Sequence, residues 1–334
     1  MDHVAIDLGG RESQVCIRDA TGTIVVERRC HNDELSTLLA KRPPSRVIVE
    51  TCAEAFGIAD EALKMGHEVR VVPATLARSL GVGARGLKTD RRDAQALSEV
   101  SCRIDLPSVH IPASVSRERK AMCTMREALV RARTLLVNSA RGWMRQQRLR
   151  LRRGSLTTFA QRLRALPVEL PAYIERQAQM IAELTEQIRA ADRELTQAAR
   201  QDPVCRRLMT VPGVGAVTAV RFVAGLDDIC RFKSGHQVAS YIGLVPGERS
   251  SSDRERRTGI TKAGAPAIRR VLILAAWSAR RARRKDAMQQ WAEEVERRRG
   301  KFVAICALAR KMAGVLFALW RDGTEYEARY AMND

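Results

Sequence analysis

The sequence has no pair of cysteines at C-x-x-C spacing and no histidine beside a cysteine at zinc-ligand spacing, although it contains eight cysteines. This argues for reduced thiols and against a structural zinc. The N-terminus lacks a basic segment followed by a long apolar one, so no signal peptide is expected. The longest apolar stretch, Phe302 to Trp320, is interrupted by Arg310 and Lys311 and indicates a core helix rather than a membrane span. We therefore expect a cytoplasmic protein without a membrane partner.

Positive charge is what the chain has in excess. It contains 58 Lys+Arg against 38 Asp+Glu, a formal net charge of +20, which indicates a polyanionic partner rather than a small-molecule substrate. The whole surplus follows Val115, because residues 1–115 carry 15 basic and 16 acidic side chains. Since 45% of the residues are hydrophobic, global disorder is excluded, and the length of 334 residues predicts two or three domains.

Residues 1–115 have the pattern of an α/β domain. Short β-prone runs and helical stretches follow one another in the order βββαβαβ: strands at 4–8, 14–18 and 24–28, a helix at 32–41, a strand at 47–50, a helix at 53–65 and a strand at 69–72. Gly66 is a plausible end for the second helix. This order implies a mixed sheet covered by helices. A glycine-rich loop at 81–86 then leads into a helix that begins near Asp90.

Residues 116–204 are expected to form a helical spacer. Residues 117–153 contain 12 basic and two acidic side chains in a mostly helical pattern, which predicts a long basic helix. A second helical stretch has an apolar seam with heptad spacing, made of Ile174, Ile181, Ile188 and Leu195, with Leu184, Ala191 and Ala198 three residues after the last three. The seam fits either a hairpin within the chain or a coiled coil between subunits, and we favour the coiled coil.

Residues 205–334 are expected to form a third domain. The segment Val211-Pro-Gly-Val-Gly215 has the form of a helix-hairpin-helix turn, in which Gly213 and Gly215 allow a tight hairpin with its N–H groups facing a DNA phosphate. A simple turn between core helices is the alternative. Farther on, residues 249–285 contain 12 basic and two acidic side chains.

Four acids stand at positions that suit metal-dependent chemistry. Asp7 and Glu50 each end an expected strand, and Asp90 and Asp93 share one face at the start of a helix. If the two strands are parallel neighbours, their last side chains converge, and such acids repel one another unless a cation neutralises them. Oxygen ligands suit Mg²⁺ or Mn²⁺. As alternatives, Asp90 and Asp93 could be ordinary helix-start acids, and the Asp7-Leu-Gly-Gly10 segment is also similar to the phosphate loop of actin-like ATPases and sugar kinases.

A serine triplet, Ser250-Ser-Ser252, lies in a polar loop that is followed by basic residues. By itself a serine triplet is usually a linker. Neighbouring guanidiniums, however, can bind a phosphate with two hydrogen bonds and stabilise the charge of a phosphodiester under attack by a serine hydroxyl. His236 is the nearest histidine and is more readily explained as structural.

Together these segments resemble a known family. Asp7, Glu50 and Lys88-Thr-Asp-Arg-Arg-Asp-Ala94 resemble a RuvC-like DEDD domain. The glycine segment at 211–215, Gly243-Leu-Val-Pro246, the serine triplet and Gly259-Ile-Thr-Lys262-Ala-Gly264 resemble the C-terminal Tnp domain of the IS-one-ten family of insertion-sequence transposases, which includes the Piv-type DNA invertases. The similarity covers essentially the whole chain.

The resemblance implies an RNase H-like fold for residues 1–115, a coiled-coil spacer, and an α-helical Tnp domain. It implies that Asp7, Glu50, Asp90 and Asp93 bind Mg²⁺, and that Ser251, or Ser250 one residue earlier, attacks DNA to give a phosphoserine intermediate. The family pairs the RuvC-like domain of one subunit with the Tnp domain of another, in a dimer or tetramer, and uses a structured non-coding RNA to pair with donor and target DNA. The residues expected to contact nucleic acid are Gly213, Gly215, Arg254, Arg256, Arg257, Lys262 and Arg269.

Three other functions are compatible with parts of the sequence. A junction-resolving nuclease would use the four acids with a water nucleophile and would form no covalent intermediate. An actin-like ATPase or sugar kinase would use Asp7, although no second phosphate loop or adenosine motif is evident. A non-enzymatic DNA- or RNA-binding protein would use only the basic segments.

Overall fold

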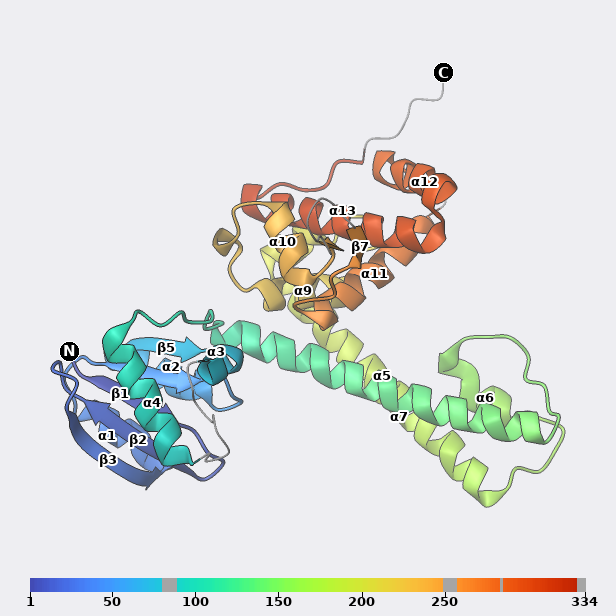
Figure 1. Ribbon diagram of the computed structural model, residues 1–334. Helices are drawn as coiled ribbons and strands as arrows, with labels where there is room; N and C mark the ends of the chain where they lie inside the picture. Colours follow the sequence, from blue (N-terminus) through green and yellow to red (C-terminus); the bar gives the residue numbers. More distant parts are fainter. Residues whose placement is uncertain (80–88, 249–256, 283–284, 329–334) are drawn as a thin grey trace. The chain divides into compact units, whose positions relative to one another are not determined.

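The computed structural model describes residues 1–79, 89–248, 257–282 and 285–328. The chain divides into two compact units, Met1–Pro112 and Ala113–Asp334 (Figure 1). The second unit contains both the residues expected to form the spacer and those expected to form the third domain. All eight cysteines are free thiols.

A five-stranded mixed sheet forms the centre of the first unit. Its strands are β1 (His3–Asp7), β2 (Glu12–Arg18), β3 (Ile24–His31), β4 (Arg46–Glu50) and β5 (Glu68–Val72), in the spatial order β3-β2-β1-β4-β5. The first three strands are antiparallel neighbours, whereas β4 runs parallel to both β1 and β5. The expected order βββαβαβ and the mixed sheet are confirmed.

Helices cover both faces of this sheet (Figure 1). Because side chains alternate along a strand, Val4 and Ile6 of β1 face the core shared with α1 (Leu35–Ala40) and α2 (Ala55–Lys64). Ala5 of β1 and Ile48 of β4 face the opposite side, where Leu97 of α4 (Asp90–Arg103) packs on them. The unit also contains the one-turn η1 (Asn32–Glu34) and the short α3 (Ala74–Ser79).

Two long helices, α5 (Ser114–Gln146) and α7 (Ala172–Gln201), pack on each other at the start of the second unit (Figure 1). The short elements η3 (Leu156–Thr158) and α6 (Phe159–Arg164) lie between them. The expectation of helix through residue 153 is wrong at its end. Arg148 has φ +55°, and the Leu149 N–H bonds to the carbonyl of Met144, five residues back, which closes the helix in the manner of a Schellman motif.

The heptad seam of α7 is buried inside the single chain. Ile174, Ile181, Ile188 and Leu195 are each at most 4% exposed. Their buried companions are Ala178, Thr185 and Ala199, four residues after a seam position, whereas Leu184, Ala191 and Ala198 are half-buried. The alternative of a hairpin within the chain therefore accounts for the burial of these four residues. Pairing between subunits stays a prediction.

The remaining elements form one helical core. They are α8 (Pro203–Leu208), α9 (Ala216–Leu226), η4 (Ile229–Arg231), α10 (Gly235–Ile242), β6 (Pro246–Glu248), β7 (Arg257–Ile260), α11 (Pro266–Arg280), α12 (Ala287–Arg299) and α13 (Lys301–Asp322). In the described part of the chain, α13 is the one helix long and apolar enough to cross a membrane. Leu308, Met312 and Leu316 of this helix are fully buried in the core of the second unit, which agrees with a core helix.

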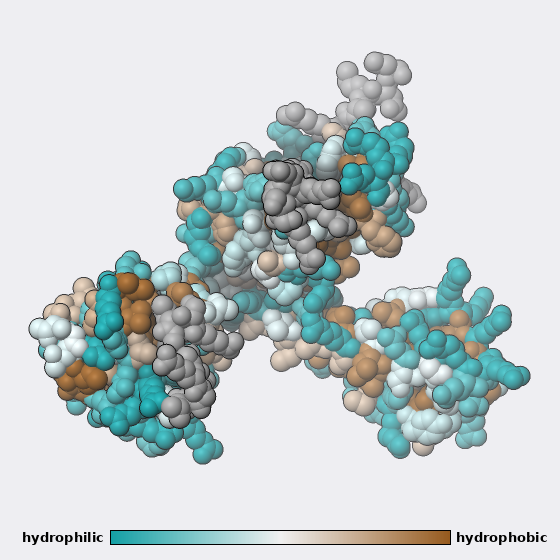
Figure 2. All heavy atoms as spheres, viewed as in Figure 1, coloured by the Kyte–Doolittle hydropathy of each residue, from teal (hydrophilic) through white to brown (hydrophobic). Residues whose placement is uncertain are grey.

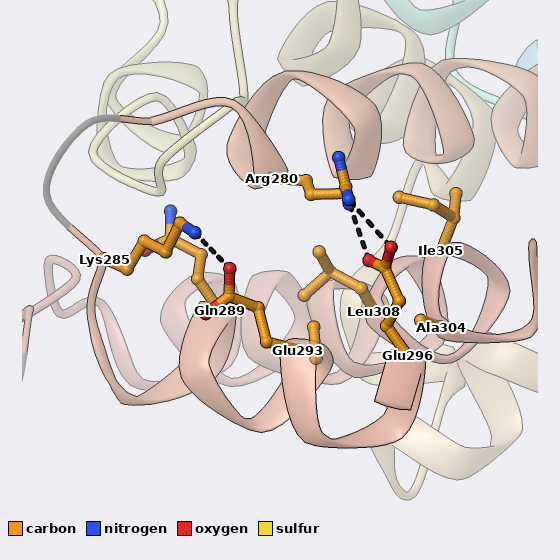
Figure 3. Close-up of a pocket in the computed structure, with 9 residues that line it drawn as sticks. Arg280, Lys285, Gln289, Glu293, Glu296, Ala304, Ile305 and Leu308 are labelled. Atoms are coloured by element: carbon orange, nitrogen blue, oxygen red, sulfur yellow. Dashed lines mark hydrogen bonds and ion pairs between the residues drawn. The ribbon is translucent and has the colours of Figure 1, made fainter. Parts of the chain in front are cut away.

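Ion pairs attach α12 to its neighbours (Figure 3). Arg280 of α11 binds Glu296 with two hydrogen bonds of 2.7 and 2.8 Å, and Lys285 bonds Glu293. Hydrogen bonding to Arg280 lowers the pKa of Glu296. The cavity between these side chains and α13 measures about 10 Å³, which is room for about one water molecule. These charges therefore hold α12 in place rather than line a ligand site.

Candidate active site and nucleic-acid interface

Asp7 and Glu50 end adjacent strands on the same face of the sheet. Strands β1 and β4 are parallel and in register up to the pair Ile6–Val49, so both acids lie one residue beyond the last registered pair. Asp7 shares the face of Ala5, and Glu50 shares that of Ile48. The expectation that these strands are parallel neighbours is confirmed, and both carboxylates lie on the side of the sheet that α4 covers.

Helix α4 brings Asp93 to the same end of that face. Ser101, near the end of the helix, shares a 2.8 Å hydrogen bond with His3 Nδ1 at the start of β1, while Leu97, one turn earlier, packs with Ala5 farther along the strand, so helix and strand run in opposite directions. From Ser101 back to Asp93 the helix rises about 12 Å, and from His3 to Asp7 the strand rises about 13 Å. Asp93 is therefore level with Asp7. It is 4% exposed, one turn before the buried Leu97.

Asp90 is placed differently from Asp93. It is the first residue of α4 and is exposed, next to the N-cap Thr89, whose side chain accepts a hydrogen bond from the Arg92 N–H. Both aspartates lie in the first turn, where the helix dipole favours negative charge. Their placement is thus compatible with the ordinary helix-start explanation for Asp90, while the burial of Asp93 over a sheet edge is not explained by the dipole.

The four carboxylates supply the oxygen donors that Mg²⁺ prefers. In the described residues, however, no group of three or more His, Cys, Asp or Glu side chains is arranged so that it could hold a metal ion. The backbone places Asp7, Glu50 and Asp93 at one end of one face of the sheet. Their side chains, as they stand in the structure, are not arranged to hold a metal ion.

The serine triplet and two expected phosphate ligands, Arg254 and Arg256, lie outside the described residues, as does the side chain of Arg257. The stem on which this loop stands is described. Strands β6 and β7 form an antiparallel ribbon, and Thr261 N–H bonds to the carbonyl of Val245 at 2.9 Å. The loop therefore leaves and re-enters the second unit at two paired strands.

Two glycines, Gly243 and Gly264, allow close backbone contacts at the base of this stem, and we call them the glycine clasp. A Cβ on Gly243, at φ +75°, would come 1.9 Å from the carbonyl oxygen of Ala263, and a Cβ on Gly264, at φ +87°, would come 1.9 Å from that of Tyr241. Only glycine fits at either position. Arg269 donates from Nη1 to the carbonyl of Ile242 at 2.6 Å. Arg269, which was expected to contact nucleic acid, thus binds the backbone beside Gly243. Lys262, next to these glycines, is exposed.

Gly213 serves the packing of α9 on α11. It has φ +87°, and a Cβ there would come 2.3 Å from the carbonyl oxygen of Ala275 and 2.7 Å from the backbone nitrogen of Ala279. Gly215 is the N-cap of α9, is exposed, and has open space where a Cβ would be. The two glycines therefore differ: Gly213 allows two helices to approach, whereas Gly215 is exposed at the start of α9.

Sequence reasoning did not find a charged network that joins three helices. Glu127 of α5 forms ion pairs with Arg131 of the same helix, with Arg221 of α9 at 3.6 Å and with Arg270 of α11. Arg221 is 4% exposed and also donates to Thr124 Oγ1 at 3.1 Å. Burial lowers the pKa of Arg221. Glu127 is one of two glutamates in a helix rich in arginine, and this was the available signal.

Comparison with known proteins gives matches over nearly the whole chain. Residues 4–148 match a family of DEDD transposases, and residues 205–292 match the family described as "Transposase IS116/IS110/IS902 family". The chain is similar to a transposase for insertion sequence element IS1328 of Yersinia enterocolitica, with 28% identity over 97% of this chain and 98% of the relative. A probable family 20 transposase of Pseudomonas aeruginosa is 29% identical over 98% of each. A putative transposase of Sinorhizobium fredii is 30% identical, covering 90% of this chain and 79% of the relative.

Proposed function

Because the chain belongs to the IS116/IS110/IS902 family of transposases, enzymes that recombine DNA, we propose that it moves an insertion sequence by metal-assisted attack of a serine on DNA. The observation that supports the metal-assisted part is the convergence of Asp7, Glu50 and Asp93 at one end of one sheet face. Carboxylates brought together from separate segments are oxygen ligands that a shared Mg²⁺ or Mn²⁺ would favour.

Asp7, Glu50, Asp90 and Asp93 are the residues that would hold Mg²⁺, with Mn²⁺ as the second choice. When bound, the ion supplies charge neutralisation for a phosphodiester under attack. The carboxylates would hold the ion at the sheet edge, and Asp90, at the exposed start of α4, is open to solvent. A junction-resolving nuclease with a water nucleophile would use the same acids, so the serine decides between the two functions.

The serine step is a transesterification between the protein and the DNA. Ser251 Oγ, or Ser250 Oγ as the second choice, forms a bond to phosphorus while the bond from phosphorus to one deoxyribose oxygen breaks. The serine proton is lost, and the freed sugar hydroxyl takes up a proton. Arg254, Arg256, Arg257 and Lys262 would neutralise the phosphate oxygens. Reversal of the step on a second DNA end joins the strands and releases the serine.

The family and the excess of basic residues support the following set of proposed partners. Donor and target DNA are substrates in the cytoplasm, a structured non-coding RNA pairs with both, and the protein works as a dimer or tetramer in which serine and carboxylates come from different subunits. The half-buried row Leu184, Ala191 and Ala198 of α7 is one apolar surface that would serve subunit pairing. The exposed start of α9 at Gly215, in a helix-hairpin-helix arrangement, would contact a DNA backbone.

The test uses the full chain with its own element DNA and co-purified RNA, and detects protein covalently joined to labelled DNA. We expect Ser251→Ala to abolish the adduct while DNA binding is kept, and Ser250→Ala and Ser252→Ala to leave it. Adduct loss only in Ser250→Ala would move the nucleophile by one residue. Nicked DNA without any adduct in the unmodified protein would replace the serine mechanism with the nuclease.

A further inference from the structure

The end of the α5–α7 hairpin is hollowed and lined with arginines. Asn138, Arg141 and Arg145 of α5, Arg152 and Arg153 of the following loop, and Arg162 of α6 surround a space of about 620 Å³. We call Arg141, Arg145, Arg152, Arg153 and Arg162 the arginine pocket. Figure 2 shows hydrophilic side chains gathered over this end of the hairpin, at the right of the view.

No carboxylate balances this charge. Residues 128–168 contain ten arginines, no lysine, no aspartate and no glutamate. In the described part of the chain, ion pairs in this segment reach Arg131 and Arg164, but none of the arginine pocket. Glu127, just before the segment, is engaged by Arg221 and Arg270. Ordinary solvated helix faces mix both signs, so a one-sign concave surface indicates an anionic ligand.

The pocket is held in shape by one of its own members. Arg162 donates from Nη2 to the Ser155 carbonyl at 2.6 Å, from Nε to Thr158 Oγ1 at 3.3 Å, and from Nη1 to the Arg152 carbonyl. A Cβ on Gly154 would lie 2.9 Å from the Arg162 guanidinium carbon. Beneath the loop, Leu149, Leu151 and Leu156 pack against the buried Phe159. Arg162 is therefore a brace, and the loop presents the other arginines from a fixed backbone.

The four remaining arginines are exposed and suited to phosphate. Arg141 and Arg145 are four residues apart on α5, so they stand on one helix face about 6 Å apart. Arg152 and Arg153 face the same hollow from the loop. A guanidinium can give two parallel hydrogen bonds to one phosphate, which a lysine cannot, and the segment uses arginine alone. Backbone contacts of this kind bind without reading sequence.

We infer that the arginine pocket binds the phosphodiester backbone of a nucleic acid, separately from the carboxylates and the serine loop. The inference rests on the proposed function only in that the chain acts on nucleic acid. RNA and DNA share this chemistry, so the source of the backbone is decided by the two arms of the experiment. The exposed arginines of the pocket bind the nucleic acid. Arg162 positions the loop and does not need to contact the nucleic acid.

The test compares Arg141→Gln/Arg145→Gln with Arg176→Gln/Arg193→Gln, which removes two exposed arginines from α7 of the same hairpin and changes the net charge equally. Affinity for an RNA duplex and for a DNA duplex of the same sequence is measured over a salt series with the full chain. For the duplex, RNA or DNA, that binds at the pocket, the slope of log affinity against log salt concentration should be smaller in magnitude by about two in Arg141→Gln/Arg145→Gln. The affinity of this variant should fall about tenfold or more. The control should change affinity less than threefold.

A third variant, Arg141→Lys/Arg145→Lys, keeps the charge and should restore part of the lost affinity, with most of the slope. If the pocket variant matches the control in both arms, or the unmodified protein binds neither duplex, the inference is overturned. The serine chemistry fails independently: Ser251→Ala should bind both duplexes like the unmodified protein. If the unmodified protein formed no DNA adduct but its salt dependence changed in the pocket variant, the serine mechanism would be refuted and the inference on the arginine pocket would be kept.

Discussion

Arginines of the first unit are largely committed to neighbouring acids, whereas those at the end of the hairpin are not. Arg42 pairs with Asp2 at 3.0 Å, and Arg46 and Arg70 share the carboxylates of Glu68 and Asp105. In the arginine pocket, no ion pair is present among the described residues. Residues 1–115 have a net charge of −1, and the remainder has +21.

The difference teaches how one chain separates binding from chemistry. Where charges are paired, they hold strands and helices together and leave little field outside the protein. Where they are unpaired and of one sign, they attract a polyanion over distances up to about 8 Å in physiological salt. Under the proposed function, the acids of the first unit would lie close to DNA once a cation neutralises them, while the second unit would supply the attraction.

The largest expected effect comes from removing one of the carboxylates at the sheet edge of the first unit. Asp7→Asn should reduce DNA strand cleavage about a thousandfold, since losing a metal ligand removes several kcal/mol of stabilisation from the transition state. Asp33→Asn, at an exposed position in η1, makes the same charge change and should leave cleavage intact. Cleavage by the Asp7 variant at the unmodified rate, with Mg²⁺ in excess, would exclude the carboxylate edge as the metal site.

The next effect concerns Glu127, the last acidic residue before the segment 128–168, which contains no aspartate or glutamate. Glu127→Gln should lower the free energy of unfolding of the second unit by about 3 kcal/mol, because the 4% exposed Arg221 loses its carboxylate. Glu186→Gln, which breaks an exposed pair with Arg189, should cost about 0.5 kcal/mol or less. Denaturant unfolding measures both. Equal losses would mean that burial of the network contributes nothing.

A smaller effect tests whether Gly213 packs helices or serves nucleic acid. Gly213→Ala should destabilise the second unit by about 2 kcal/mol, since the new Cβ would meet the Ala275 carbonyl at a left-handed backbone position. Gly215→Ala, with open space at its Cβ, should cost about 0.5 kcal/mol. Thermal melting compares the two, and a stable Gly213 variant that has lost only DNA affinity would reverse the assignment.

The smallest effect is a dependence on pH. Because Arg280 lowers the pKa of Glu296, this pair stabilises the fold above the ordinary glutamate value of 4.5, and the contribution is lost as pH falls through the lower folded pKa. Glu296→Gln should therefore melt slightly below the unmodified protein at pH 7, with the difference vanishing as the pH falls below 4.5. A difference that grows on acidification would contradict the sign.

Much of the first unit could be predicted from sequence because its signals are local. Alternating apolar runs and turn residues predicted the order βββαβαβ, and acids at the ends of buried runs predicted that Asp7 and Glu50 share an edge. The second unit was harder. Helices α5 and α7 were expected, but a heptad seam is equally satisfied by a neighbour within the chain or by another subunit, so their pairing could not be deduced from spacing.

The sequence by itself determined where the charge lies and which strands alternate, since these depend on residue type and period. Only the tertiary structure decided that Arg269 and Gly213 serve packing, that Arg221 and Arg270 meet at Glu127, and that five arginines surround one hollow. The reason is that a side chain's role depends on the neighbours that distant segments bring to it. Residue type limits those neighbours but does not select them.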